Sequence, residues 1–296
     1  MTRTSPGTER APRIGAVVVL YRPPGEVLRN IDSYLPQVDV LFAVDNSDRP
    51  DEDRIGPLRR RGNVVYLWNG MNVGLAKALN IGAARAMEHG CQFLLMMDQD
   101  SVASSNLVSE FIAYCSGHPL KDIGLLAPWH AYRNYDRPPE GSNVREIEMT
   151  ITSGTMLNLD AYRAAGPFMD ELFIDYVDFE YCLRLRTLGF RIIQLSDAVL
   201  DHALGNTVAR NFLFRRVAVY NHEPVRVYYR FRNRLRVAWL YCRRYPGWSM
   251  RELVLLANEV VKILCFEERK AAKCRMAFRG IVDFILNRSG KYGGGA

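Results

Sequence analysis

The sequence lacks the segments that would anchor or export a protein. It contains no run of about 18 uninterrupted apolar residues, the length a transmembrane helix needs. The start, MTRTSPGTERAPR, has no apolar core of a secretory signal, and we expect residues 1–12 to form a disordered leader. A cytoplasmic protein is therefore predicted.

Paired cysteines are also missing. The six cysteines include no CxxC pair, which argues against a zinc site built on cysteine pairs and against a disulfide framework. Reduced thiols that serve as small apolar side chains fit this spacing better. Internal repeats and low-complexity segments are absent too, so a globular protein is expected.

Lysine is scarce, and arginine is concentrated in one segment. Residues 210–244 hold ten arginines and one acid, a local net charge of +9 within a total of +7. A solvated helix face would explain this segment, and so would a partner such as a diphosphate, an anionic lipid or a nucleic acid. RNP-like and helix-turn-helix patterns are absent, so nucleic acid is not an expected partner.

Apolar runs alternate with helix-like segments along the first hundred residues. Strands are predicted at 14–21, 38–44, 63–68 and 93–97, and helices at 26–35, 54–61 and 75–88. This alternation favours an α/β fold with a mostly parallel sheet, in which ligands bind beyond the carboxyl ends of the strands.

The second half is less regular. Helices are predicted at 104–115 and 177–188, strands at 123–128, 146–152 and 190–195, and an irregular loop that shapes the acceptor site at 129–145. From about residue 225 the chain becomes helical and amphipathic, most clearly at 250–266. This stretch fits docking on a membrane surface or a contact between two copies of the chain.

Two aspartates follow the fourth predicted strand, in FLLMMDQDSV. Residues two apart in an extended segment point to the same side, so Asp98 and Asp100 are expected to converge while Gln99 faces away. Two close carboxylates suit a hard divalent cation such as Mg²⁺, which completes its shell with water and phosphate oxygens.

The same letters fit the DxDx(T/V) signature of haloacid-dehalogenase-type phosphatases, in which the first aspartate is a nucleophile. That motif follows the first strand of its fold, whereas three strand-helix units precede Asp98 here. The phosphatase also needs a downstream lysine, and between Asp100 and Lys262 only Lys121 occurs. A phosphatase is therefore disfavoured.

Three further stretches carry candidate site residues. NVGLAKALN places Asn72 and Gly74 before a helix, whose N-terminus is a favourable place for a phosphate. FIDYVDFEY crowds Asp175, Asp178 and a glutamate at a helix start, more acids than capping explains, so one is a candidate general base. His202 follows the strand predicted at 190–195 and is a candidate metal ligand.

Together these pieces resemble glycosyltransferase family 2, and within it the bacterial rhamnosyltransferase-like branch. The resemblance runs from about residue 13 to 245 and follows the order of the family's motifs. The matching stretches are VVVLYRP, VDNSD, NVGLAKALNIG, DQDS, ITSGTMLNLDAYRAAGPFMDELFIDYVDFEYCLR, DHALGN and YYRFRN.

The resemblance implies a glycosyltransferase A fold, a Rossmann-like and mostly parallel sheet with flanking helices. The catalytic domain would span 13–224, with a nucleotide-binding half at 13–103 and an acceptor half at 104–224. A helical segment would follow at 225–288, and a flexible tail at 289–296.

The resemblance also implies roles for individual residues. Asp178 would be the catalytic base, although Val177 replaces the glutamate that usually precedes it, which leaves Asp175 as a competitor. The metal, Mg²⁺ or Mn²⁺, would be bound by Asp100, His202 and Asp98. The nucleotide sugar would be bound by Tyr21, Asp45, Asn72, Gly74, Lys77, Asp98 and Gln99. The acceptor side would include Ser153, Gly154 and Asp175.

The implied activity is an inverting transfer of L-rhamnose from dTDP-L-rhamnose to a glycan or lipid-linked acceptor in cell-surface polysaccharide synthesis. One alternative is a family 2 enzyme that uses a UDP- or GDP-linked sugar, and another is a non-catalytic sugar-nucleotide-binding subunit. For the arginine-rich segment, the resemblance suggests the donor diphosphate and an anionic membrane surface as partners. A homo-oligomer through the C-terminal helices is the other expected association.

Overall fold

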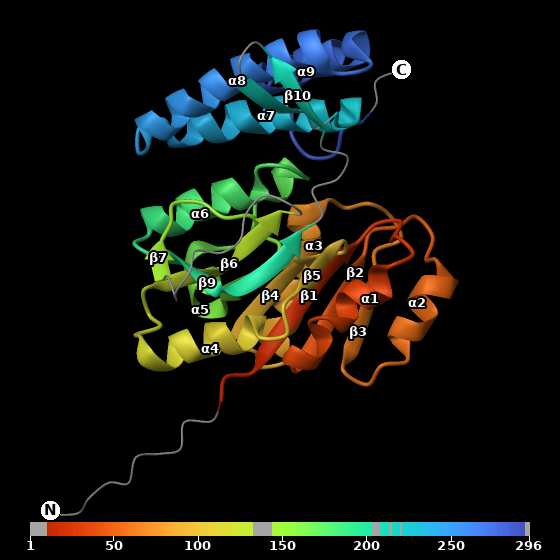
Figure 1. Ribbon diagram of the computed structural model, residues 1–296, viewed down its shortest axis with the longest axis vertical. Coiled ribbons are helices and arrows are strands. Elements are labelled where there is room, and N and C mark those ends of the chain that lie inside the picture. The colour runs from red at the N-terminus through yellow and green to blue at the C-terminus, as the bar shows by residue number, and fades with distance from the viewer. Residues whose placement is uncertain (1–10, 133–143, 203–207, 213–214, 220, 294–296) are drawn as a thin grey trace, which may run out of the picture.

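A computed structural model of the chain describes residues 11–132, 144–202, 208–212, 215–219 and 221–293. Within these residues one nine-stranded mixed sheet forms the centre, with helices on both faces and a further layer of helices above one face, as Figure 1 shows. The predicted α/β class is confirmed.

The sheet has the strand order β3-β2-β1-β4-β8-β6-β9-β5, and β7 pairs with β9. Its strands are β1 (Ile14–Leu20), β2 (Val40–Asp45), β3 (Val64–Trp68), β4 (Phe93–Asp98), β5 (Ser101–Ala103), β6 (Ile123–Tyr132), β7 (Val144–Glu146), β8 (Thr155–Asn158) and β9 (Arg191–His202). The first four are parallel, whereas β8 runs antiparallel to β4 and β6.

The register of the parallel strands brings their carboxyl ends level. Leu20 at the end of β1 lies opposite Asp45 of β2, and Val19 lies opposite Asp98 of β4. Polar groups from β2 and β4 therefore lie level with the end of β1 at one edge of the sheet, where ligands of such folds bind.

Helices cover the two faces because the strands are apolar on both sides. Val17 packs into one core cluster and Val18 into the other, and each is fully buried, which contributes about 1.5–3 kcal/mol per side chain. One face is covered by α1 (Val27–Asp32), α2 (Glu52–Arg59) and α4 (Leu107–Gly117). The other is covered by α3 (Leu75–Glu88), α5 (Leu159–Ala165) and α6 (Val177–Thr187).

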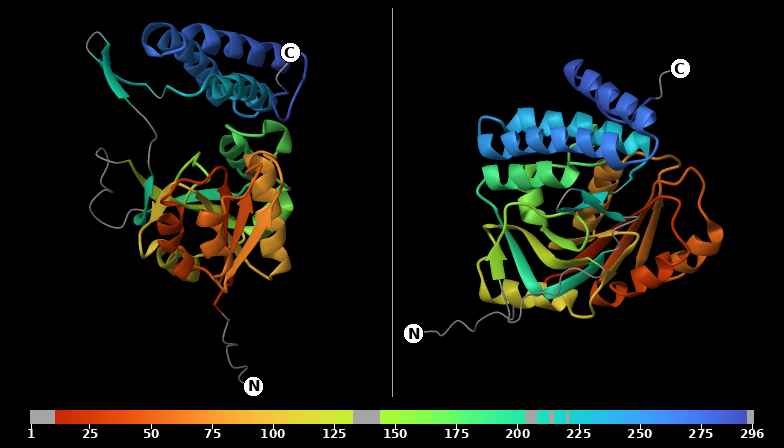
Figure 2. Two further views of the ribbon diagram at one scale, coloured as in Figure 1. Left: turned by 90° about the vertical axis from the view of Figure 1, so that its right-hand side faces the viewer. Right: turned by 45° about the horizontal axis from the view of Figure 1, so that its top comes forward.

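The C-terminal helices form the outer layer seen at the top of Figures 1 and 2. They are α7 (Pro224–Tyr241), α8 (Pro246–Phe266) and α9 (Lys270–Ile285). Val237 of α7 and Trp248 of α8 belong to the same core cluster as Leu185 of α6, so this layer shares the core of the sheet domain. None of the helices in the described part of the chain is long and apolar enough to span a membrane.

The remaining elements are short. The 3-10 helices η1 (Leu35–Gln37) and η2 (Asp170–Leu172) lie in connections, and β10 (Val208–Phe212) pairs with β11 (Arg215–Val219) as an antiparallel hairpin. The predicted leader falls largely on residues 1–10, outside the described residues, as does most of the predicted loop at 129–145. Of the predicted tail at 289–296, residues 289–293 are described, and there the Gly290 N–H donates to the Glu171 carbonyl at 2.7 Å.

One predicted strand is wrong. The segment 146–152 alternates in polarity, but β7 ends at Glu146 and the chain then follows an irregular path to β8, which the sequence analysis missed. The Ile147 N–H still donates to the Ile192 carbonyl of β9 at 2.9 Å, and further along the hydroxyls of Thr150 and Thr155 both donate to the carbonyl of Ile151. Hydroxyl groups thus replace a strand partner at Ile151.

Candidate functional site

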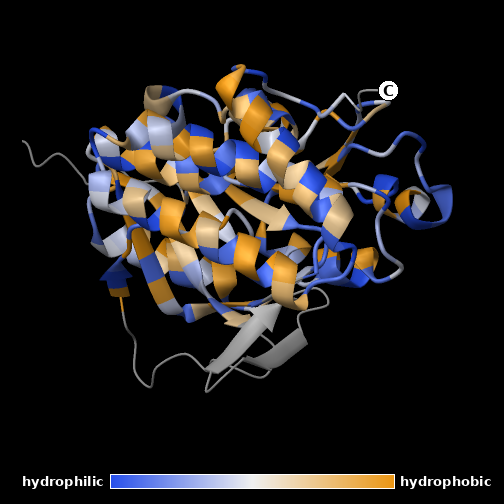
Figure 3. Cartoon of the chain, turned by 90° about the horizontal axis from the view of Figure 1, so that it is seen from above, coloured by the Kyte–Doolittle hydropathy of each residue, from blue (hydrophilic) through white to orange (hydrophobic). Residues whose placement is uncertain are grey.

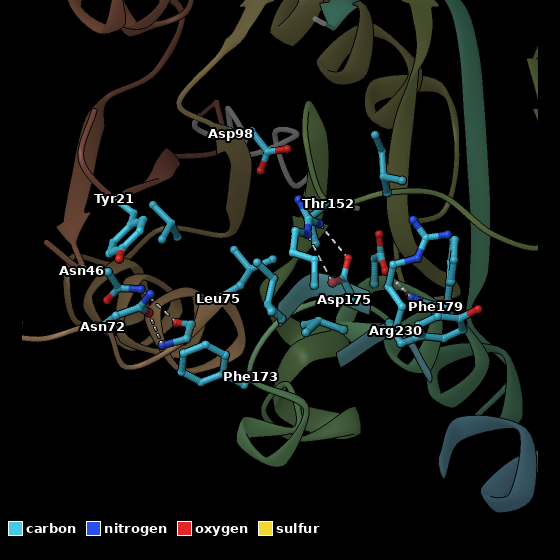
Figure 4. A pocket seen from close by; sticks show the side chains of 18 of the residues that line it. Tyr21, Asn46, Asn72, Leu75, Asp98, Thr152, Phe173, Asp175, Phe179 and Arg230 are labelled. Atoms are coloured by element: carbon cyan, nitrogen blue, oxygen red, sulfur yellow. Dashed lines mark hydrogen bonds and ion pairs between the residues drawn. The ribbon is translucent and has the colours of Figure 1, made fainter. Parts of the chain in front are cut away.

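A cavity of about 510 Å³ opens at the carboxyl ends of β1 and β4, between the sheet and α7 (Figure 4). One side carries polar groups from the sheet, and the other carries the start of α6 and one face of α7. The lining residues are Val19, Tyr21, Asn46, Asn72, Gly74, Leu75, Asp98, Gln99, Asp100, Ile151, Thr152, Phe173, Ile174, Asp175, Tyr176, Val177, Asp178, Phe179, Arg226, Arg230 and Arg234.

The DQD stretch forms a turn in the cavity wall. β4 ends at Asp98 and β5 begins at Ser101, so the extended geometry expected for the two aspartates is wrong. Both aspartates nevertheless line the cavity, and so does Gln99, which was expected to face away. The Gln99 side chain accepts a hydrogen bond from the Tyr21 N–H at 2.9 Å and donates to the Tyr21 carbonyl at 3.2 Å. These two hydrogen bonds connect the end of β1 to the acidic turn.

Ser153 and Gly154 support that turn from behind. The fully buried Ser153 hydroxyl accepts from the Asp98 N–H at 3.2 Å and donates to the Ser101 hydroxyl at 2.8 Å. Gly154 has φ +73°, and a Cβ there would lie 2.8 Å from a Leu200 methyl carbon. Neither residue lines the cavity. Ser153 supports the acidic turn directly, whereas the Gly154 N–H donates to the Met96 carbonyl of β4 at 2.8 Å.

Asp45 lies beside the cavity and does not line it. Its carboxylate is fully buried and accepts hydrogen bonds from the Ser47 N–H at 2.8 Å and the Tyr66 hydroxyl at 2.6 Å. Burial, together with this bond to Asp45, raises the pKa of Tyr66. Asp45 thereby fixes the loop that presents its neighbour Asn46 to the cavity.

The start of α3 joins the two halves of the site. The Gly74 N–H donates to the Asn72 side chain at 3.0 Å, and the Leu75 N–H donates to the Phe173 carbonyl at 2.6 Å. Gly74 has φ +93°, and a Cβ there would lie 2.6 Å from the Phe173 ring, so only glycine permits this approach. These two N–H groups are engaged within the chain, and Lys77 is exposed and does not line the cavity.

The acids around the start of α6 have different partners. Asp175 forms an ion pair with Arg226 at 2.7 Å, and the buried Glu180 forms one with Arg184. Asp178 lines the cavity and accepts the Phe179 N–H at 2.9 Å, and it forms no ion pair within the described residues.

Burial raises the pKa of Asp178 to about 7, an effect that the Phe179 N–H opposes and that the nearby carboxylates of Asp175 and Asp98 reinforce. A carboxyl group that titrates near neutral pH suits a general base, because it exchanges a proton readily at the working pH.

Arginines on α7 form the opposite wall, although none of them was predicted individually as a site residue from the sequence. Arg226, Arg230 and Arg234 are four residues apart, so they share one face of the helix. Arg230 and Arg234 both form ion pairs with Glu259 of α8, at 3.1 and 2.9 Å. The i, i+4, i+8 spacing within YYRFRN and its flanks was the available signal.

His202 is the last residue of β9. The β5–β9 register sets it opposite Ser101, one residue beyond Asp100, while its side chain is outside the described part of the structure. Among the described residues no cluster of three or more histidine, cysteine, aspartate or glutamate side chains is arranged to hold a metal ion. Asp98 and Asp100 are the described carboxylates on this wall.

The chain is similar to known proteins along most of its length. The profile of the family described as Glycosyl transferase family 2 matches residues 16–158. The dTDP-rhamnosyl transferase RfbF of Shigella flexneri is 28% identical over 299 residues, which cover 94% of this chain and 97% of that protein.

Solved structures share the fold at low sequence identity. S. aureus TarS 1-349 in complex with UDP-GlcNAc has a TM-score of 0.55 at 14% identity, covering 92% of this chain and 71% of that one. GalNAc-T7 with UDP, GalNAc and Mn²⁺ has a TM-score of 0.56 at 13% identity, covering 66% of this chain and 44% of that one. The acidic turn after β4, the carboxyl group at the start of α6 and these similarities agree with one another: residues 16–158 match glycosyltransferase family 2, and the chain as a whole is similar to a glycosyltransferase.

Proposed function

We propose that this enzyme transfers L-rhamnose from dTDP-L-rhamnose to a hydroxyl group of a glycan or lipid-linked acceptor in cell-surface polysaccharide synthesis. The near-complete coverage in the similarity to a dTDP-rhamnosyl transferase supports the donor. The observation that carries the reaction type is Asp178, a carboxyl group with a pKa near 7 in the same cavity as the DQD turn.

The cavity residues divide into a donor wall and a base wall. Tyr21, Asn46, Asn72 and the DQD turn would bind the nucleotide sugar at the carboxyl ends of the strands. Asp178 would take the proton of the acceptor hydroxyl as that oxygen attacks the anomeric carbon. One displacement from the side opposite the diphosphate inverts the anomeric centre.

The DQD turn fits a hard divalent cation, Mg²⁺ or Mn²⁺. Asp98 and Asp100 offer carboxylate oxygens into the cavity, and His202 adjoins them through the β5–β9 register. Mg²⁺ typically takes one or two carboxylates and completes its shell with phosphate oxygens and water. When bound, such an ion offsets the negative charge that develops on the leaving nucleoside diphosphate.

Asp45 and Lys77 stay predictions as donor-binding residues. Because Asp45 is fully buried, a contact with the donor base requires that its carboxylate become accessible, and a contact from Lys77 requires a side-chain conformation that reaches the cavity. Asp175 stays an acceptor-side prediction, and it lines the cavity beside the base.

A thermal-shift screen of nucleotide sugars with Mg²⁺ tests the donor. We expect dTDP-L-rhamnose to raise the melting temperature more than UDP-glucose, UDP-N-acetylglucosamine or GDP-mannose, because at equal concentration a ligand that binds more tightly stabilises the folded state more. A larger shift with a UDP- or GDP-linked sugar would overturn the rhamnosyl assignment and leave the glycosyltransferase family intact.

We also propose that α8 docks the enzyme on an anionic, cytoplasmic membrane surface. Figure 3 shows apolar residues along the outer helices. On α8 Met250, Val254, Val261 and Leu264 lie along one helix face and are 49–63% exposed. This stripe is the docking face.

Charge distinguishes a membrane from a second copy of the chain. Between residues 224 and 293 Glu252, Glu259, Glu267 and Asp283 form ion pairs inside the structure. The exposed basic side chains on and beside the three helices include Arg243, Arg244, Arg251, Arg269, Lys270, Arg275, Arg288 and Lys291, and they outnumber the exposed acid of the same region, Glu268. Two such surfaces would repel each other, whereas anionic lipid attracts them.

Vesicle flotation tests the docking face. The Val254→Asp/Val261→Asp variant should lose binding to phosphatidylglycerol vesicles, and wild-type binding should fall as salt rises. Leu188→Asp, at an equally exposed apolar position beyond α6, is the matched control and should bind like wild type. Unchanged binding by the α8 variant would overturn the proposal, and a wild-type dimer that this variant dissociates would favour oligomerisation instead.

A further inference from the structure

The segment that leads into the base is held in a backbone conformation that non-glycine residues rarely adopt. Phe173, Asp175 and Tyr176 have φ values of +66°, +62° and +68°, all in the left-handed region. Tyr176 is the N-cap of α6, and Asp178 follows two residues later. Such a segment persists only where the surrounding structure determines it strongly.

Asn233 of α7 provides several of the hydrogen bonds that hold this segment in its conformation. It is fully buried, and its side-chain NH₂ group donates to the carbonyls of Leu172 at 2.8 Å, Ile174 at 2.8 Å and Asp175 at 3.0 Å. Its side-chain oxygen accepts from the Arg232 side chain at 2.9 Å. One side chain therefore binds three carbonyl groups in a four-residue stretch.

Neighbouring α7 side chains fix the two ends of the segment. The fully buried Arg232 donates to the carbonyls of Glu171 and Leu172, each at 3.2 Å. At the other end the Tyr176 hydroxyl donates to Glu252 of α8 at 2.6 Å and accepts from the Arg234 side chain. Arg232 is thus buried and bonded within the chain, away from the cavity, whereas the arginine-rich sequence predicts residues that face an anion.

The same segment also contacts the donor wall, because the Phe173 carbonyl accepts the Leu75 N–H of α3. Its conformation therefore sets the position of the base relative to the nucleotide side of the cavity. Small displacements of a catalytic group strongly affect rate, since about 1 Å of misplacement can lower it 10²-fold.

We propose that Asn233 is a positioning residue for the base, acting through the backbone of residues 172–176 and not through contact with a substrate. The inference rests on the proposed role of Asp178. It assigns a role to the RFRN part of the YYRFRN motif, where the buried Arg232 and Asn233 hold backbone carbonyls and do not line the cavity.

Hydrogen exchange of the free protein tests the structural half of the proposal. Asn233→Ala should speed amide exchange at residues 173–178 at least about 10-fold, because the three carbonyls lose their shared donor. Asn80→Ala is the matched control, since Asn80 binds Phe168 and Asp170 through its side chain just before this segment. Its effect should be confined to residues 168–170, and equal effects of both variants at 173–178 would overturn the proposal.

Kinetics test the functional half, with dTDP-L-rhamnose hydrolysis as the probe reaction. Asn233→Ala should lower kcat at least about 10-fold while the dissociation constant for dTDP changes less than about 2-fold, because the donor wall stays in place. Asn80→Ala should leave kcat within about 2-fold of wild type. A parallel loss of kcat and dTDP binding in Asn233→Ala would indicate a general structural defect and contradict the proposal.

Tyr176→Phe is the second variant if Asn233→Ala does not fold. It keeps the ring and leaves Arg234 paired with Glu252 at 3.3 Å, so no buried charge loses its partner. We expect faster exchange at 173–178 and a lower kcat with unchanged dTDP binding, and wild-type values for both would overturn the proposal. Asp178→Asn separates the proposed base from the proposed positioning residue. Wild-type turnover in that variant would refute Asp178 as the base, while hydrogen exchange in Asn233→Ala would still test whether Asn233 holds residues 172–176.

Discussion

Replacing Asp178 by asparagine is expected to lower kcat by about 10²–10⁴-fold, the usual contribution of a general base. Asparagine keeps the shape of the side chain and its acceptor for the Phe179 N–H, but it cannot take a proton. Donor binding should be nearly unchanged, because the nucleotide side of the cavity lies on other elements. The measurements are steady-state sugar transfer and calorimetric titration with dTDP and Mg²⁺.

Asp175→Asn is the matched control for this experiment. Asp175 also lines the cavity, but its carboxylate is engaged in an ion pair with Arg226 at 2.7 Å. We expect a reduction in kcat well below that of Asp178→Asn. If Asp178→Asn transfers sugar at the wild-type rate and Asp175→Asn does not, Asp175 is the base. Wild-type rates in both variants would favour a base outside this segment.

The pH dependence follows from the same carboxyl group. Because burial raises the pKa of Asp178 to about 7, the active carboxylate form is lost as pH falls through that value, and kcat/KM should fall with it. The effect of pH on the stability of the fold has the opposite sign. The folded state favours the protonated form, so this group's contribution to stability decreases as pH rises toward 7.

At pH 8 Asp178→Asn should therefore melt no lower than wild type. Asparagine removes the unfavourable burial of an ionised carboxylate, whereas a variant that merely damages the fold would lose activity and melt earlier. The combination of lost turnover and retained melting temperature separates a catalytic carboxylate from a structural one. It also separates an active glycosyltransferase from a non-catalytic nucleotide-binding subunit.

The sequence predicts the sheet well where one pattern determines the structure. The continuous β-branched run of β1 is buried on both faces, and the alanine-rich helix predicted at 75–88 is α3, residue for residue. The position of the acidic turn after β4 is likewise predictable, because only strand order and the end of an apolar run are needed. These features depend on local periodicity.

Partners of individual side chains are not predictable in the same way. Asp45 and Ser153 occupy motif positions that suggest ligand contact, yet their bonding groups meet Tyr66 and Ser101, residues distant in sequence. The buried Arg232 and Asn233 bind the carbonyls of a segment about 60 residues earlier in the chain. Which polar groups face the cavity and which support it is decided by tertiary contacts that no local pattern encodes.

Removal of divalent cations is expected to abolish sugar transfer, and added Mg²⁺ or Mn²⁺ to restore it. The DQD turn directs Asp98 and Asp100 toward the cavity that would hold the diphosphate. Without a cation these carboxylates would repel the donor phosphates, so affinity for dTDP should fall along with turnover. Transfer and calorimetric dTDP binding are measured in EDTA and then with each metal.

Asp100→Asn gives the residue-level form of this test. The variant should need at least about 10-fold more Mg²⁺ for half-maximal transfer, because metal-binding residues set affinity through their charge. Asp48→Asn, which removes an exposed acid paired only at the surface with Arg22, is the control and should keep the wild-type requirement. Transfer that is indifferent to EDTA would exclude a metal role for the turn. Another positive charge would then have to offset the charge of the diphosphate. Arg226 and Arg230, which line the opposite wall of the cavity, are the described candidates for that role.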